Sequence, residues 1–171
     1  MKKLTIFGKE YVIIERKNHD DSIRIEDNRI IIPHSKESGY TQLKETISEL
    51  LYSQLLDILD SIKRAGAVEV FGDLDFEIVE KIDKHPQRMA KLKGNRILIK
   101  LSAVVLPKQV LRYIIAHELG HIATRRHNSK FWNIVKLMCP NFREAKHLLE
   151  RYKDKIQKFE RELKLPQIPM L

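Results

Sequence analysis

The segment Tyr113–Trp132 has the sequence YIIAHELGHIATRRHNSKFW and contains the pattern His-Glu-x-x-His. Residues four apart lie on one face of an α-helix, so His117 and His121 can direct two imidazoles toward the same ion. The apolar run 110–116 precedes them and predicts a buried helix, for which Pro107 is a suitable first residue. This helix is therefore the element around which we expect the fold to be built.

A third histidine, His127, follows six residues after the pattern. It lies too far along the chain to share the helix face of His117 and His121. We therefore expect the helix to end near residues 124–126 and the chain to turn back toward the same ion. Zinc in proteins prefers four ligands, and three protein ligands leave one position for water, which is typical of a catalytic site.

Glu118 stands beside the first histidine and would contact this water rather than the ion. Zinc lowers the pKa of its bound water to about 7. The carboxylate could then accept the water proton and pass it to a leaving amine, as a general base does. The sequence thus predicts a Zn²⁺ site with the ligands His117, His121 and His127 and with Glu118 as the catalytic base.

Other interpretations of these residues exist. The pattern can occur by chance in a core helix without a metal, and a bound metal could be structural, although no fourth Cys or His ligand lies nearby. Glu144 or Glu150 could replace His127 as the third ligand, and His147 could stabilise an oxyanion. For these three residues a solvated helix face is the simpler explanation.

The segment from Tyr113 to Phe142 resembles the YgjP-like zinc metallopeptidases. That family has a Tyr-aliphatic-His-Glu-Leu-x-His helix, a turn similar to Asn-His-Ser, a Phe-Trp pair and a later proline. The matching residues here are Tyr113, His117, Glu118, Leu119, His121, His127, Ser129, Phe131, Trp132 and Pro140.

The resemblance implies zinc at the three histidines and Glu118 as the base. SprT-like proteases and metzincins are more distantly similar. One segment differs from the family, which usually has Trp-Gly-Ser-Cys before the hairpin that leads into the metal helix. This chain has HPQRMAKLKGNRILIKLSAVVLP at residues 85–107, so the likeness does not extend to the wall of the substrate cleft.

The remaining patterns predict an α+β fold with N-terminal β-hairpins, a long helix, a small mixed sheet and C-terminal helices, and the resemblance implies that this fold is a zincin-like metallopeptidase domain. Alternating apolar residues and turn residues indicate the hairpins, and helical spacing indicates the helices. The first hairpin should turn at Gly8-Lys9 in a type II′ turn, and Asp27-Asn28 should form the second turn. We expect hairpins at 4–16, 22–33 and 88–101, strands at 68–71 and 76–79, and helices at 41–63, 107–124, 130–138 and 142–163.

Length and composition fit one domain over residues 1–171, with a hairpin region at 1–40, a helix and sheet at 41–106, and the metal helix and C-terminal helices at 107–171. Hydrophobic residues make up 43% and charged residues 32% of the chain, which indicates a folded protein. The only cysteine, Cys139, cannot form an internal disulfide, so a cytoplasmic location is expected. No apolar run reaches the roughly 20 residues of a membrane span.

The function that these observations favour is a zinc-dependent metallopeptidase acting on a peptide or protein. Strand 96–100 is the candidate for pairing with an extended substrate. The net charge of +9 also allows contact with nucleic acid or other anions. Two alternatives follow: a UTP-type nucleotide pyrophosphatase, as linked to some YgjP-like relatives, although no GxxxxGKS loop is present, and a SprT-like protease associated with nucleic acid.

Overall fold

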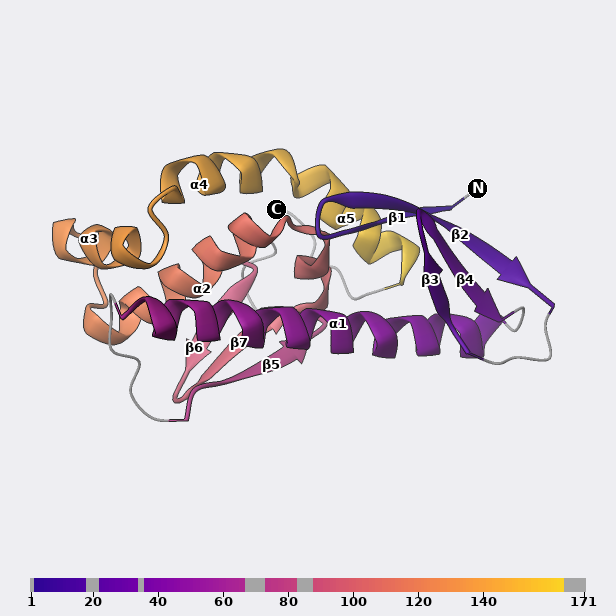
Figure 1. The fold of residues 1–171 in the computed structure, drawn as a ribbon, viewed down its shortest axis with the longest axis horizontal. Coiled ribbons are helices and arrows are strands. Elements are labelled where there is room, and N and C mark those ends of the chain that lie inside the picture. Colours follow the sequence, from indigo (N-terminus) through magenta and orange to yellow (C-terminus); the bar gives the residue numbers. More distant parts are fainter. Residues whose placement is uncertain (1, 18–21, 34–35, 67–72, 83–87, 165–171) are drawn as a thin grey trace.

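The protein is described by a computed structural model that covers residues 2–17, 22–33, 36–66, 73–82 and 88–164. Two small mixed sheets lie along one long helix, α1, and further helices cover the other side (Figure 1). This arrangement confirms the predicted α+β class.

The N-terminal sheet has the strand order β1-β2-β4-β3. Its strands are β1 (Lys3–Ile6), β2 (Lys9–Arg16), β3 (Arg24–Glu26) and β4 (Arg29–Pro33). Each of the two predicted hairpins forms, β1 with β2 and β3 with β4, and the second turns at Asp27-Asn28. The hairpins join through parallel pairing of β2 with β4, a contact that local sequence patterns do not encode.

The turn between β1 and β2 differs from the predicted one. Ile6 pairs with Lys9, so the loop consists of Phe7 and Gly8 rather than Gly8 and Lys9. Both loop residues have positive φ (49° and 81°), as in a type I′ turn and not a type II′ turn. The reason is tertiary: the N–H groups of Phe7 and Gly8 donate to the carbonyls of Val104 (2.6 Å) and Val105 (2.9 Å).

Helix α1 (Lys36–Ala65) begins five residues before the predicted start at Thr41. Within this added first turn, a Cβ at Gly39 would lie 2.9 Å from the carbonyl oxygen of Pro33. Only glycine lets the first turn of the helix pack so closely against the end of β4. The helix ends as predicted before Gly66, which has a φ of 65°.

The second sheet has the order β5-β7-β6, formed by β5 (Asp75–Val79), β6 (Ala90–Lys93) and β7 (Arg96–Lys100). The predicted hairpin with Gly94 at its tip and the strand at 76–79 are confirmed, whereas the strand predicted at 68–71 lies outside the described residues. The candidate role of strand 96–100 in pairing with the substrate is wrong. This strand, β7, is central and pairs with β5 on one side and with β6 on the other, so neither edge is open.

The C-terminal half contains η1 (Leu101–Val105), α2 (Lys108–Ala123), α3 (Ser129–Met138), α4 (Phe142–Arg151) and α5 (Lys153–Glu162). The helix predicted over 142–163 is two helices, because the chain bends at Tyr152 (φ −92°, ψ 0°). The bend lets α4 contact α2 while α5 contacts η1 and β1. Two different docking surfaces therefore decide the break.

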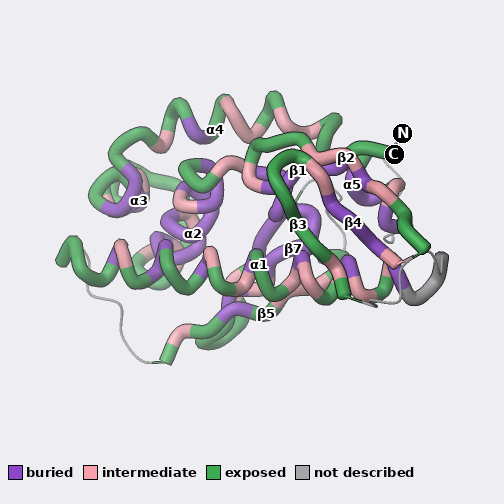
Figure 2. Tube along the Cα trace, turned by 45° about the vertical axis from the view of Figure 1, so that its right-hand side comes forward, coloured by how far each residue is buried: buried purple, intermediate pink, exposed green. Residues whose placement is uncertain are grey.

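The apolar core lies between α1, α2 and the two sheets, where the buried segments converge in Figure 2. Helix α2 is buried along most of its length, which places the histidines near its end at the border between core and solvent. None of the described helices combines the length and apolar character that crossing a membrane requires.

Candidate metal centre

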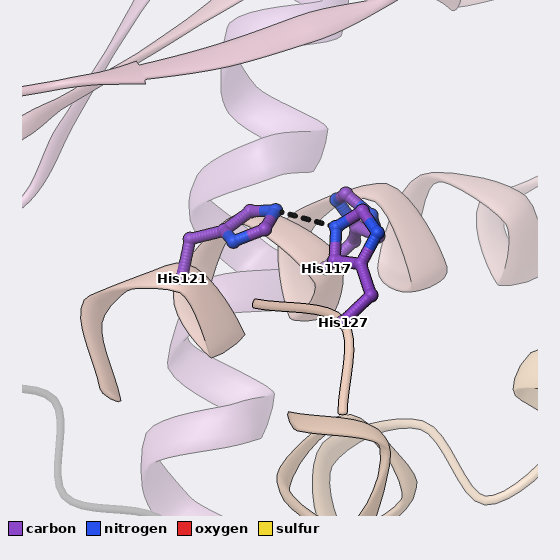
Figure 3. A group of neighbouring side chains, drawn as sticks. All are labelled: His117, His121 and His127. Carbon is purple, nitrogen blue, oxygen red and sulfur yellow. Dashed lines mark hydrogen bonds between the residues drawn. The ribbon is translucent and has the colours of Figure 1, made fainter. Parts of the chain in front are cut away.

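Helix α2 presents His117 and His121 one turn apart, near its C-terminal end. The helix ends at Ala123, and Thr124 adopts an extended conformation (φ −154°, ψ 134°) that turns the chain. The return brings His127 back to the other two histidines, so the three rings cluster as predicted (Figure 3).

The three imidazoles are close enough to hold one ion. One ligand atom from each lies within 4.8 Å of the others, and the Nε2 atoms of His121 and His127 are 3.0 Å apart. Nitrogens at 2.0–2.1 Å from a tetrahedral zinc would be about 3.3 Å apart. The donor set therefore matches a tetrahedral metal once the more widely separated imidazole nitrogens, now within 4.8 Å, close to this spacing.

Within the part of the chain that the structure describes, this is the only cluster of three or more potential ligands. The alternative third ligands Glu144 and Glu150 do not belong to it, nor does His147. His117 and His121 are partly buried and His127 is exposed, so solvent can reach the cluster.

Helix α3 packs against the histidine cluster through its first turn. Its N-cap residue, Asn128, accepts a hydrogen bond from the Phe131 N–H (3.0 Å) and thereby fixes the turn next to His127. The ring centroid of Phe131 lies 4.7–5.2 Å from those of the three histidines. The Phe131 ring thus packs against all three imidazoles, and Trp132 lies beside it, with its ring centroid 5.9 Å from that of His127.

Gly120 is a supporting residue that the sequence interpretation missed. A Cβ there would lie 2.7 Å from Cε2 of Phe131 and 3.2 Å from a methyl group of Val135. Glycine therefore allows α3 to contact the surface of α2 between the two histidines. The signal in the sequence was a glycine inside a helix, where it is otherwise unfavourable.

Glu118 is 5% exposed and is held at both oxygens. Its Oε2 accepts the backbone N–H of Leu92 in β6 (3.1 Å), and its Oε1 lies 3.5 Å from Nδ1 of His117. A carboxylate beside Nδ1 favours a proton there and leaves Nε2 free for a metal. The Leu92 amide, supplied by a strand 26 residues upstream, was not foreseen.

The surroundings of His127 favour the neutral form of its imidazole. Partial desolvation by the packed neighbouring rings lowers the pKa of His127, although its side chain is exposed on one side, and the neighbouring His117 and His121 lower it further. The neutral, metal-binding form of His127 thus persists to lower pH. Burial also raises the pKa of Tyr113 to about 12, with smaller contributions from Cys139 and Glu118, so its hydroxyl stays protonated.

Together the α+β scaffold, the HExxH helix and the returning third histidine are those of a zincin-like metallopeptidase domain. The family model described as "YgjP-like, metallopeptidase domain" matches residues 1–152, and the chain belongs to this family. The family supports a metallopeptidase-type hydrolase with a metal and with peptide or protein substrates. The comparison with curated proteins finds no match, and neither does the comparison with solved structures.

Proposed function

We propose that the protein is a zinc-dependent peptidase in which His117, His121 and His127 hold the ion and Glu118 is the general base. The observation that carries the proposal is the convergence of three imidazoles beside a buried carboxylate. Three nitrogen ligands with access to solvent are the donor set of a catalytic zinc site rather than a structural one.

When bound, the zinc would polarise the scissile carbonyl and supply a water with a pKa near 7. Glu118 would take a proton from the attacking water and deliver it to the departing amine. The Leu92 N–H holds one oxygen of the Glu118 carboxylate in place. The other oxygen lies beside His117 and thus faces the histidine cluster. The buried ring of Phe131 covers the side of the three imidazoles that faces α3 and keeps solvent away from that side.

Strand β6 is the better candidate for binding an extended peptide, because it is the edge strand beside α2. The N–H of Leu92 points away from β7 to Glu118, and the carbonyl of Ala90 points away to accept Nε of Arg88 (3.0 Å). These two groups are thus already occupied by Glu118 and Arg88, so a substrate strand added at this edge would pair with other backbone groups of β6.

The direct test is Glu118→Gln in the full-length protein. We expect this variant to retain zinc, measured by metal analysis, and to lose hydrolysis of an unfolded protein substrate. Glu144→Gln is the matched control, because Glu144 is exposed on α4 and lies outside the cluster. Purified wild-type protein that binds no zinc, or a Glu118→Gln variant with full activity, would refute the assignment.

The net charge of +9 keeps two other activities worth testing beside the first. A UTP-type pyrophosphatase would release pyrophosphate from nucleoside triphosphates, and a SprT-like protease would bind nucleic acid with steep salt dependence. Both assays use the same preparation as the peptidase assay, so the relative activities decide between the three functions.

We also propose that residues 1–171 form one metallopeptidase domain. The family match ends at 152, but α5 beyond it packs on η1 and β1. A cytoplasmic location stays a prediction that rests on the single cysteine.

A further inference from the structure

A pocket of about 540 Å³ lies next to the cluster, between α3 and α4. It is lined by Trp132, Phe142, Arg143, Lys146, His147 and Glu150. Trp132 packs beside His117 and His127 but takes no part in the proposed reaction. The pocket is therefore a second site that the proposed reaction has not used.

The walls of the pocket combine aromatic rings with cations. Trp132 and Phe142 stack, with centroids 5.2 Å apart and planes at 19°. Lys146 Nζ lies 5.3 Å from the Trp132 centroid, and the guanidinium carbon of Arg143 lies 5.6 Å from that of Phe142. Because the rings stack on each other and cations lie over them, a nucleobase would have to displace these cations to stack there.

The charge of the pocket is positive. Neither Arg143 nor Lys146 forms an ion pair with a carboxylate among the described residues, whereas Glu150 is paired with Lys153 (2.5 Å). Two unpaired cations above an apolar floor favour a small anionic group with an aliphatic stem. A carboxylate on a peptide has this chemistry.

The pocket and the candidate metal centre share Trp132 as a common wall. The centroid of its ring lies 5.9 Å from that of His127 and 6.3 Å from that of His117. Lys146 Nζ lies 5.3 Å from the Trp132 centroid. The distance from His127 to this cation is therefore no longer than about three residues of extended peptide, at roughly 3.3–3.6 Å per residue. A peptide bound at the metal can therefore reach the pocket.

We propose that the α3–α4 pocket binds a carboxylate of the peptide substrate, so that the enzyme selects peptides with an acidic group within about three residues of the scissile bond. The carboxylate comes from an Asp or Glu side chain or from the C-terminus. This inference rests on the proposed peptidase function and adds the class of substrate to it.

Trp132 is the only tryptophan of the chain, so its fluorescence reports on the pocket directly. The test titrates full-length Glu118→Gln protein in zinc-containing buffer with peptides free of Trp and Tyr. Two amidated peptides differ only in Glu or Gln at one position, and a third has the Gln sequence with a free C-terminus. We expect about three- to tenfold tighter binding of the Glu peptide or of the free C-terminus than of the amidated Gln peptide.

The same titration on Lys146→Gln and Arg143→Gln should abolish this preference and leave binding of the amidated Gln peptide unchanged. Lys136→Gln, which removes an exposed cation of α3 outside the pocket, is the matched control and should keep the preference. A merely structural role of Lys146 would weaken all peptides alike.

Equal affinity of the three peptides for the parent protein would overturn the inference, and so would a preference that survives both substitutions. Cleavage of Glu and Gln peptides at equal kcat/KM by the wild type would overturn the pocket alone, whereas absence of any binding or cleavage would overturn the peptidase function with it. Tighter binding of a single-stranded oligonucleotide that competes with the Glu peptide and depends on Lys146 would assign the pocket to nucleic acid instead.

Discussion

Glu118 illustrates at the scale of a single residue how the site limits the freedom of its proposed base. One carboxylate oxygen accepts the Leu92 N–H and the other lies beside His117. A carboxylate fixed in this way needs little rearrangement before it accepts a proton, which favours fast proton transfer. The hydrogen bond from Leu92 should therefore matter more for the rate than for the fold.

Leu92→Pro tests this role, because the N–H of Leu92 points to Glu118 and not to β7. Proline is tolerated on an edge strand when its missing N–H is not part of the ladder. A hydrogen bond to a charged group is worth about 1.5–3 kcal/mol, so kcat should fall at least about tenfold while zinc content is retained. Leu92→Ala, which keeps the N–H, should stay near the wild-type kcat; an unchanged kcat in the proline variant would contradict the role.

Cys139 gives a prediction for pH at the same scale. Burial raises the pKa of its thiol above the usual value, with Arg112 opposing the shift. The folded state thus favours the protonated thiol. The contribution of this preference to the free energy of unfolding is fully present below the thiol pKa of the unfolded chain, about 8.5–9. It is lost as the pH rises from that value through the higher pKa of the folded state. We expect no reaction with a disulfide reagent at pH 8 in native protein and one equivalent after unfolding in urea; fast native reaction would show an accessible thiol.

At the scale of elements, the contact between α2 and α3 positions the third histidine. Phe131 and Val135 of α3 lie against Gly120 of α2, and α3 begins directly after the turn that contains His127. The distance between the two helices therefore sets the position of one imidazole relative to the other two.

Gly120→Ala should separate these helices. In an exposed helix the change would stabilise the protein by about 1 kcal/mol, because alanine is the better helix former. Here the new methyl group would lie 2.7 Å from the fully buried Phe131, so we expect a loss of about 1–3 kcal/mol and weaker zinc binding. Urea unfolding and zinc titration measure both, and a gain in stability would show that α3 can move away freely.

The edge strand is the second feature at this scale. The sequence predicts the hairpin of β6 and β7 correctly, because Gly94 and Asn95 mark its turn. It does not predict which strand lies at the edge, because that depends on the pairing of β7 with β5, a strand about 20 residues upstream. The edge strand beside α2 is therefore β6 and not β7.

The whole molecule extends beyond the segment that the family model covers. Helix α5 follows residue 152 and buries Ile156 and Phe159, with Leu163 just after it. These side chains fill the space between β1 and η1, so the C-terminal helix completes the core that holds the N-terminal sheet.

Phe159→Ala should therefore lower the free energy of unfolding by about 3–5 kcal/mol, as expected for a large aromatic residue in a core. Lys158→Ala, one residue earlier and exposed, should change it by less than about 0.5 kcal/mol. Urea unfolding followed by circular dichroism measures both variants. A Phe159→Ala variant as stable as the wild type would mean that the domain ends at the family boundary.

The features readable in the amino-acid order are those that depend on neighbours along the chain. Spacing of four along α2 places His117 and His121 on one face, and turn residues mark the hairpins, since these geometries follow from local backbone conformation. Other features required distant segments to meet: the Leu92 hydrogen bond to Glu118, the edge position of β6, the bend at Tyr152 and the pocket beside Trp132. Their free energy comes from contacts between segments far apart in sequence, and no local pattern contains it.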